Sequence, residues 1–504
     1  MSTDFSETDR IEIAEKQILE LYRADDLPWI VGYSGGKDSS TVLQLVWNAV
    51  RRIPAEEREK QIFVISTDTL VENPIVATWV EQSLNKINAV SKSEQLGIVA
   101  HRLTPKLEDR FWVNLIGRGY PAPRPMFRWC TSRLKINAST DFIRNIASER
   151  GEAVLFLGTR TGESQARKKS MAKVAGSTRE LLSRNSDPRL DRVWVFPVIS
   201  DWSSDDVWEY LIENENPWGH SNQELFHLYK GATPDAECPL VVDKSTPSCG
   251  DSRFGCYVCT MVDKDKSMSA MIQNNDDKKW MIPLAQFREK KLDTSDDFPV
   301  RDFRRMDRRI QKFDRGGVPS LLHGPYKQSY REELLAELLK AQTEIQKNAP
   351  KGLENFSLIS IEELEEIRRI WVEEKHEIED SLPRIFYEVT GKRYPASEND
   401  DASIFTPEDL AILKDICSSP GDPEHMQYQM LREMLQIEQS YRGAYRRVGI
   451  FDLLEKSVKD HAFHDPKEAL EFLMSNTDVE AHEDETMSSQ HDLFDEKKSL
   501  GQRS

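Results

Sequence analysis

The residue pattern with the clearest chemical meaning is Ser34-Gly35-Gly36-Lys37-Asp38-Ser39, which lies between an apolar run, 29–33, and a helical pattern. Glycines let backbone N–H groups approach an anion closely, and the start of a helix adds a favourable partial charge. Lys37 adds a full positive charge, and the serines add hydroxyl donors. The pattern predicts a phosphate-binding loop; the alternative is an ordinary glycine-rich turn with an incidental lysine.

Two further polar clusters follow predicted strands. Asp68 comes after the run 61–66, where it could bind a nucleotide group or Mg²⁺, or simply end the strand. Gly158 and Arg160 open the polar stretch 158–167, whose arginines suit phosphate. The alternative for this stretch is a capped helix start with arginines on a solvated face.

The elements that would position these clusters alternate between strands and helices. We expect strands over 29–33, 61–66, 97–103, 153–157 and 193–198, with helical segments between them. This alternation predicts an α/β fold with a doubly wound, mostly parallel sheet. Ligands of such sheets bind outside the carboxyl ends of the strands, which is where all three clusters fall.

Four cysteines with the spacing C-x10-C-x6-C-x2-C predict a metal or iron–sulfur site: Cys238, Cys249, Cys256 and Cys259. Four thiolates suit tetrahedral zinc and iron–sulfur clusters equally, so the spacing leaves the centre open. The alternative is a loop of unligated cysteines.

Cys130 stands apart, in a segment that also carries Arg128, Arg133 and Lys135. These cations predict a lowered thiol pKa, and the resulting thiolate could carry a persulfide sulfur as a nucleophile. Two other interpretations stay open: Cys130 replaces one of the four clustered cysteines as a ligand, or it is a structural thiol. Cys417 has core spacing on a predicted helix and is given no role.

The composition narrows the class of protein. The 504 residues carry a net charge of −18, which argues against a protein that coats nucleic acid generally. Any nucleic-acid contact must come from a local basic patch, and two stretches qualify: 301–315, with seven basic and three acidic residues, and the weaker 441–447. The alternative for the first is a solvated helix face. We expect a cytoplasmic protein without a membrane span or signal peptide.

Taken together, these stretches resemble the phosphoadenosine phosphosulfate (PAPS) reductase branch of the PP-loop ATP pyrophosphatases. The matching pieces are the 34–39 loop, Asp68 in Ser-Thr-Asp-Thr, 130–135, 158–167 and 196–208. The resemblance implies an adenine nucleotide alpha hydrolase-like domain that cleaves ATP between its α- and β-phosphates. Lys37, Asp38, Cys130 and Arg160 would then be catalytic.

The rest of the chain departs from simple PAPS reductases, which are shorter and carry a catalytic cysteine near the C-terminus. The long extension and the cysteine insert resemble the DndC-type sulfurtransferases of bacterial DNA phosphorothioation, and the related SspD proteins are similar. This resemblance implies ATP, Mg²⁺ and a [4Fe–4S] cluster, with zinc as the alternative. It also implies DNA, a cysteine desulfurase and other Dnd-type proteins as partners. PAPS reductase-like, tRNA-thiolating and non-catalytic nucleotide-binding proteins remain alternatives.

The expected organisation has four parts. Residues 1–230 form the PP-loop, PAPS reductase-like domain, and 231–284 the cysteine-rich iron–sulfur segment. Residues 285–475 form a mainly helical region that includes the basic stretch. Residues 476–504 form an acidic, disordered tail.

Overall fold

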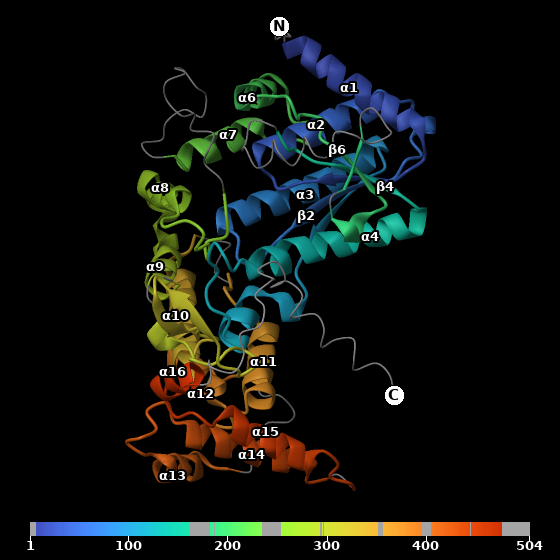
Figure 1. Ribbon diagram of the computed structural model, residues 1–504. Coiled ribbons are helices and arrows are strands. Elements are labelled where there is room, and N and C mark those ends of the chain that lie inside the picture. The colour runs from blue at the N-terminus through green and yellow to red at the C-terminus, as the bar shows by residue number, and fades with distance from the viewer. Residues whose placement is uncertain are drawn as a thin grey trace. The chain divides into compact units, whose positions relative to one another are not determined.

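A computed structural model describes residues 7–160, 182–185, 187–233, 254–292, 295, 297–350, 356–395, 405–443 and 445–475. Cys238, Cys249, most of the 158–167 stretch and the predicted tail lie outside these residues. The contacts divide the chain into two compact units (Figure 1). Unit 1 comprises Met1–Arg301 and Tyr326–Ala402, and unit 2 comprises Asp302–Pro325 and Ser403–Ser504. The predicted four-part division stays a prediction.

Unit 1 contains a six-stranded sheet in the order β3-β2-β1-β4-β6-β5. Five strands pair in parallel, and all five were predicted: β1 (Trp29–Gly32), β2 (Ile62–Thr67), β3 (Ile98–Leu103), β4 (Ala153–Phe156) and β6 (Val193–Phe196). The short β5 (Ser183–Arg184) adds an antiparallel edge that the sequence did not predict. The prediction of an α/β, mostly parallel sheet is confirmed.

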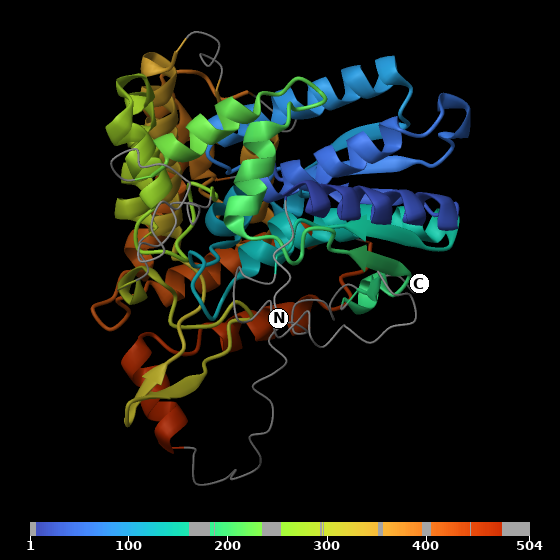
Figure 2. The same cartoon turned by 90° about the horizontal axis from the view of Figure 1, so that it is seen from above.

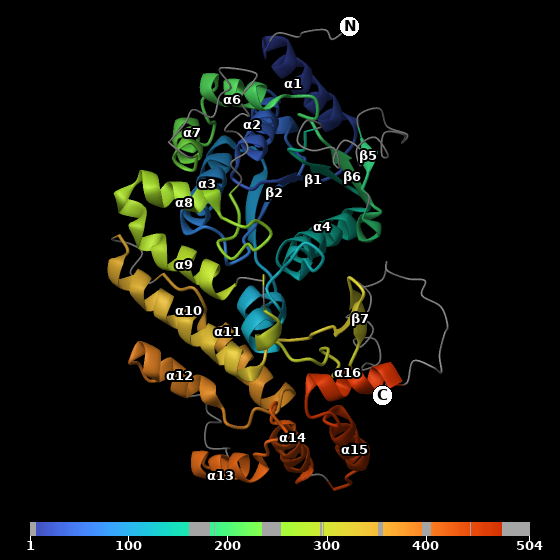
Figure 3. The same ribbon diagram turned by 60° about the vertical axis from the view of Figure 1, so that its left-hand side comes forward.

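β1, β2, β4 and β6 bury side chains on both faces of the sheet, as covered parallel strands do, whereas β3 leaves Val99 exposed. Trp29 and Val31 pack into one large core together with α1 (Glu7–Ala24), α2 (Lys37–Arg51) and α3 (Pro74–Glu94). Ile30, between them, faces the other side and packs with α4 (Asn137–Arg150). Figure 3 shows α4 on the opposite side of the sheet from α2 and α3, and Figure 2 shows the blue helices side by side from above. The sheet is therefore doubly wound.

A second, mainly helical core completes unit 1. It contains the aromatic segment around Phe111 and Trp112, together with the helices that follow the sheet. These helices are α8 (Lys266–Asn274), α9 (Ile282–Lys291), α10 (Gln328–Asn348), α11 (Ile361–Arg369) and α12 (Ser381–Thr390). Two further helices, α6 (Ser204–Glu213) and α7 (Asn222–Gly231), pack on the sheet core. No helix in the described residues is long and apolar enough to cross a membrane.

Reciprocal capping boxes start two helices of unit 1. Ser203 pairs with Asp206 before α6, and Ser360 pairs with Glu363 before α11. α10 begins at Gln328, and its N-cap Lys327 makes no side-chain cap hydrogen bond.

Unit 2 combines the hairpin β7 (Lys312–Arg315) and β8 (Val318–Leu321) with four helices: α13 (Pro407–Cys417), α14 (Met426–Tyr441), α15 (Ile450–Asp460) and α16 (Pro466–Ser475). Its small core contains Phe303, Leu321, Met426 and Ala469. α13 begins with a capping box between Thr406 and Asp409.

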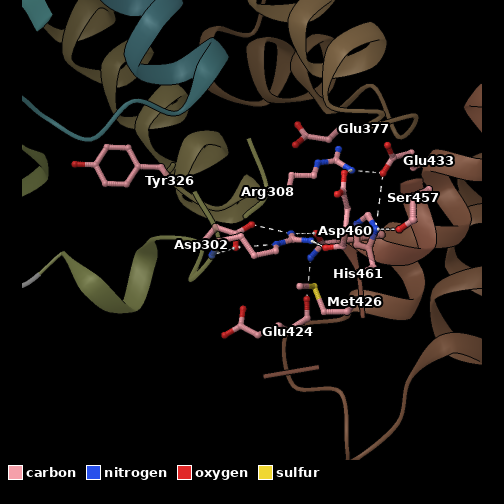
Figure 4. Close-up of polar contacts among 12 residues, drawn as sticks. Asp302, Arg308, Tyr326, Glu377, Glu424, Met426, Glu433, Ser457, Asp460 and His461 are labelled. Carbon is pink, nitrogen blue, oxygen red and sulfur yellow. Dashed lines mark hydrogen bonds and ion pairs between the residues drawn. The ribbon is translucent and has the colours of Figure 1, made fainter. Parts of the chain in front are cut away.

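Part of the basic stretch 301–315 lies inside unit 2 as a charge network. Buried Arg304 donates to both carboxylate oxygens of Asp302, at 3.0 and 2.8 Å, and to the backbone oxygen of Asp460 at 3.0 Å. Arg308 bonds the Glu433 carboxylate, as Figure 4 shows. The stretch forms loops and a strand, so its interpretation as a solvated helix face is wrong. Two further arginines of the stretch also pair with carboxylates, Arg301 with Asp297 and Arg309 with Asp307.

Candidate functional site: a phosphate loop beside a cysteine segment

The 34–39 segment forms a tight turn between β1 and α2. Gly35 has a φ of +72°, which L side chains rarely adopt, and Trp79 fixes its carbonyl with an Nε1–H donor at 3.2 Å. Ser39 braces the turn from within: its hydroxyl accepts from the Ser34 N–H at 3.1 Å and donates to the Gly36 oxygen at 3.0 Å. Gly36 is the N-cap of α2 and supplies no side-chain cap. The geometry matches the predicted anion-binding turn.

Two buried cations share one carboxylate next to this turn. Lys37 Nζ lies 3.2 Å from one oxygen of Asp38, and Arg160 Nε donates to the other at 2.6 Å. The side chains of Lys37 and Arg160 are 6% and 8% exposed. Both cations contact Asp38 in the first turn of α2, at the positive end of the helix dipole. This arrangement is electrostatically suited to a phosphate group.

Gly158 brings the loop after β4 against the phosphate loop. A Cβ placed on Gly158 would lie only 2.9 Å from the backbone carbon of Asp38. The lack of a side chain at Gly158 thus permits the close approach that lets Arg160 reach Asp38. Gly158 and Arg160 thus both lie against the loop: Gly158 approaches the backbone of Asp38, and Arg160 bonds its side chain.

The order of the strands explains why a ligand is expected at this loop in a doubly wound sheet. From β1 the chain goes to β2 and β3 on one side, and it later returns to place β4 and β6 on the other. Ligands of doubly wound sheets bind outside the carboxyl ends of the strands at such a reversal. The phosphate loop follows β1 and the Arg160 loop follows β4, so both stand at the reversal.

Asp68 follows β2 at the same edge, but both its oxygens have protein partners. Arg102 Nε donates to one oxygen at 2.9 Å, and the Leu70 N–H donates to the other at 2.8 Å. Leu70 itself has a φ of +63°, so this bond supports a sharp turn. These contacts favour the interpretation that Asp68 ends the strand over direct binding of Mg²⁺ or nucleotide.

The predicted lowering of the Cys130 pKa is wrong. Burial raises the pKa of this thiol, and nearby Lys135 offsets only a small part of the increase. Arg128 is exposed to solvent, and Arg133 is held by Asp109 at 2.5 Å, so neither arginine stabilises a thiolate here. Cys130 is therefore a neutral thiol at the start of a π-helical turn, Thr131–Ile136.

Cys130 shares its surroundings with two of the four predicted metal ligands. Its electrostatic neighbours include Cys259, and those of Cys256 also include Cys259. Burial, and the nearby Glu72 carboxylate, raise the pKa of Cys256 to about 12. Lys135 forms an ion pair of 3.3 Å with Glu72, beside these thiols. The structure thus brings Cys130 near Cys256 and Cys259, which belong to a segment more than 120 residues later in the sequence.

Within the described residues, no group of three or more Cys, His, Asp or Glu side chains has an arrangement that could hold a metal ion. The thiols of Cys130, Cys256 and Cys259 are free and partly buried. Cys238 and Cys249 lie outside the described residues. Iron–sulfur clusters and zinc both prefer soft thiol donors, so the type of donor fits either centre. The three thiols do not, however, form a complete ligand set among the described residues.

Sequence reasoning missed Tyr229, which lies on α7. Its hydroxyl accepts from the Lys37 backbone N–H at an N···O distance of 3.4 Å. Its ring also packs edge-on against Phe254 at 4.7 Å, two residues before Cys256. A contact across 192 residues has no local signature, and the alternation of apolar residues in α7 predicts only a core tyrosine. Trp79 was missed for the same reason.

Comparison with known proteins gives one family. Residues 28–261 match the model of the phosphoadenosine phosphosulfate reductase domain. The search of curated proteins returns no match. The matched segment begins at the first strand, contains the phosphate loop and the Arg160 loop, and ends just after Cys259. Over residues 28–261 the chain is therefore similar to the phosphoadenosine phosphosulfate reductase domain, a family whose members are enzymes that act on adenine nucleotides.

Proposed function

We propose that the protein is an ATP pyrophosphatase and sulfurtransferase that helps to replace a non-bridging oxygen of the DNA backbone by sulfur. One observation carries the nucleotide part of this proposal: Lys37 and Arg160 surround a single carboxylate at the N-terminus of α2, at the reversal of the sheet. Two cations at the positive end of the α2 dipole suit a polyphosphate, and the similarity of residues 28–261 to the family domain supports an adenine nucleotide.

The first step would be adenylation. A DNA phosphate oxygen attacks the α-phosphorus of ATP, the bond between the α-phosphorus and the bridging oxygen breaks, and pyrophosphate leaves. Lys37 and the amides of the loop stabilise the charge that develops on pyrophosphate. Arg160, which Asp38 orients, binds the polyphosphate. The product is an adenylated DNA phosphate, from which AMP can leave.

The second step would be sulfur transfer. A persulfide, formed with sulfur from a cysteine desulfurase, attacks the adenylated phosphorus through its terminal sulfur, and AMP leaves. A second thiol then attacks the sulfur–sulfur bond, which releases the phosphorothioate and leaves a disulfide. Cys130 as the persulfide carrier stays a prediction. Its closeness to Cys259 favours the alternative that it is a cluster ligand.

The proposed [4Fe–4S] cluster would be held by cysteines drawn from Cys130, Cys238, Cys249, Cys256 and Cys259, and it would supply a redox or sulfur-handling centre when bound. For Mg²⁺, the described carboxylates fit less well. Asp38 is engaged by two cations and Asp68 by Arg102, so neither offers a vacant pair of oxygens. Mg²⁺ would therefore enter with the phosphates of ATP, as is common for this ion.

A second candidate is a PAPS reductase-like activity, which the family match itself favours. Against it stands Cys417, the last cysteine of the chain, which is buried on α13 and only 4% exposed. A buried thiol is not available to attack a sulfur donor, so the chain lacks the accessible C-terminal cysteine of simple reductases.

The decisive experiment offers the full chain ATP, Mg²⁺ and DNA and measures AMP and pyrophosphate. We expect both products, and we expect Lys37→Ala to reduce their formation by about 10²–10³-fold, since it removes a preorganised charge. ADP and phosphate would contradict the proposal, and nucleotide binding without either product would indicate a non-catalytic subunit. PAPS serves as the competing substrate: adenosine 3′,5′-bisphosphate and sulfite would support the second candidate.

Two further measurements address the finer parts of the proposal. Mass spectrometry of digested DNA, after reaction with a cysteine desulfurase and other Dnd-type proteins, should detect phosphorothioate linkages, and sulfur found in tRNA instead would redirect the assignment. Iron and sulfide analysis after anaerobic purification addresses the cluster, for which stoichiometric zinc without sulfide is the contrary result.

A further inference from the structure

The connection between α14 and α15 in unit 2 is unusually exposed. We call its described residues, 442–443 and 445–449, together with Phe451 at the start of α15, the arginine–tyrosine loop. Tyr445 is 99% exposed, Phe451 81% and Val448 77%. Large apolar side chains that are exposed as a group mark an interaction surface more often than single exposed ones do.

The charge of this loop contrasts with that of the chain. From 439 to 451 there is no acidic residue, although the whole chain carries a net charge of −18. The loop contributes three exposed arginines, of which Arg447 pairs with Glu438 at 3.1 Å. Arg442 and Arg446 form no ion pair with any carboxylate in the part of the chain that the structure describes.

The other basic stretch of unit 2 behaves differently. In 302–315, Arg304 and Arg308 are held by Asp302 and Glu433. Their charge is balanced inside the unit, so these arginines are not available to an external polyanion. Of the two stretches, the arginine–tyrosine loop is the one that presents uncompensated charge next to an exposed ring.

We propose that the arginine–tyrosine loop binds nucleic acid, with Arg442 and Arg446 on backbone phosphates and Tyr445 stacked on an unpaired base. This inference rests on the proposed function, which makes DNA the substrate. Exposed aromatic rings flanked by cations are the combination that binds single strands, because stacking and phosphate contact act together. The charges of Arg442 and Arg446 favour a polyanion over an apolar protein partner. The ring of Tyr445 favours a single strand over a duplex, because it can stack only on a base that is not already stacked.

The test measures binding of the full chain to a labelled 20-nucleotide single strand by fluorescence anisotropy, from 50 to 200 mM salt. We expect Tyr445→Ala to weaken binding by about 5- to 100-fold, and Tyr445→Phe to retain it, since the ring does the stacking. Arg442→Ala/Arg446→Ala should lower the slope of log affinity against log salt by about 0.7 per arginine.

The matched control is Arg309→Ala/Lys312→Ala, which removes the same charge from the other basic stretch and should leave the affinity within about twofold. Equal losses in both double variants would overturn the proposal, since binding would then follow net charge alone. An affinity unchanged by Tyr445→Ala, or no binding by the natural chain, would also overturn it. Binding of a non-hydrolysable ATP analogue is measured in parallel without DNA, so a failed nucleotide assignment is distinguished from a failed DNA contact.

Discussion

Two regions of the molecule gather cations around carboxylates in buried surroundings, and they differ in their place in the fold. At the phosphate loop of unit 1, Lys37 and Arg160 contact the carboxylate of Asp38 in the first turn of α2. In unit 2, Arg304 and Arg308 face the carboxylates of Asp302, Glu433 and Asp460. The first group lies at a helix N-terminus after a strand of the sheet, and the second joins the segment before β7 to α14 and α15.

The difference helps to separate a binding site from a structural network. A buried cation whose carboxylates come from several elements of one unit holds those elements together, and loss of one partner leaves an uncompensated charge. Cations beside a glycine turn at a helix N-terminus stand where backbone N–H groups and the helix dipole favour an anion. The position of Lys37 and Arg160 thus suits a ligand, and the network of unit 2 suits stability.

The largest effect that would sharpen this comparison is expected from Arg304→Met. It leaves the Asp302 carboxylate without its bidentate partner, and breaking a buried pair costs about 3–5 kcal/mol. Denaturant unfolding, followed by hydrogen exchange of α14 and α15, measures the change. Arg309→Met is the control, because Arg309 is 86% exposed and should change the free energy of unfolding by less than about 0.5 kcal/mol. Equal effects of the two substitutions would contradict a structural role for the network.

The next effect is the acid sensitivity of unit 2. Burial, together with Arg304 and Arg308, lowers the pKa of His461 to about 4, while Glu433 opposes the shift. The unfolded chain therefore takes up a proton near pH 6.5 that the folded state refuses until about pH 4. Stability is fully present above pH 6.5 and is lost as the pH falls towards 4, by up to about 3 kcal/mol.

His461→Asn tests this interpretation. In the natural chain Nδ1 lies 2.8 Å from the Ser457 backbone oxygen, a contact that Figure 4 shows and that an amide N–H can replace. The variant has no imidazole to titrate, so its free energy of unfolding should change less with pH between 6.5 and 4. An unaltered pH dependence would assign the acid sensitivity to the carboxylates instead.

The smallest of the three effects concerns the other region. Arg160→Met should weaken binding of a non-hydrolysable ATP analogue by about 10- to 100-fold, since a hydrogen bond to a charged group is worth about 1.5–3 kcal/mol. Calorimetric titration measures the dissociation constant. Arg102→Met is the matched control, since Arg102 pairs with Asp68 outside the loop and should leave the affinity nearly unchanged. Equal losses would instead place Asp68 in the nucleotide site.

Much of unit 1 could be predicted from the sequence because its signals are local. The glycine turn after β1 and the five parallel strands are each specified by a few consecutive residues. β5 was missed because a strand of two residues has no periodicity to detect.

The parts that could not be predicted depend on contacts between distant residues. Cations near Cys130 in the sequence suggested a thiolate, but Arg133 turns to Asp109 and burial dominates the pKa. The basic stretch suggested a surface, but the carboxylate that binds Arg308 comes from 125 residues away, at Glu433. A sequence pattern reports which charges are present, whereas only the folded chain reports which of them are neutralised.

Tyr229 gives the phosphate loop and the cysteine segment a common neighbour. Its hydroxyl lies at the Lys37 amide, and its ring lies on Phe254, two positions before Cys256. A phosphate oxygen that took this amide would compete with the hydroxyl for the same hydrogen. Tyr229 would thereby link the binding of nucleotide at the loop to the surroundings of the thiols. The rate of chemical labelling of Cys256 would then report whether the loop, more than two hundred residues earlier in the chain, is occupied.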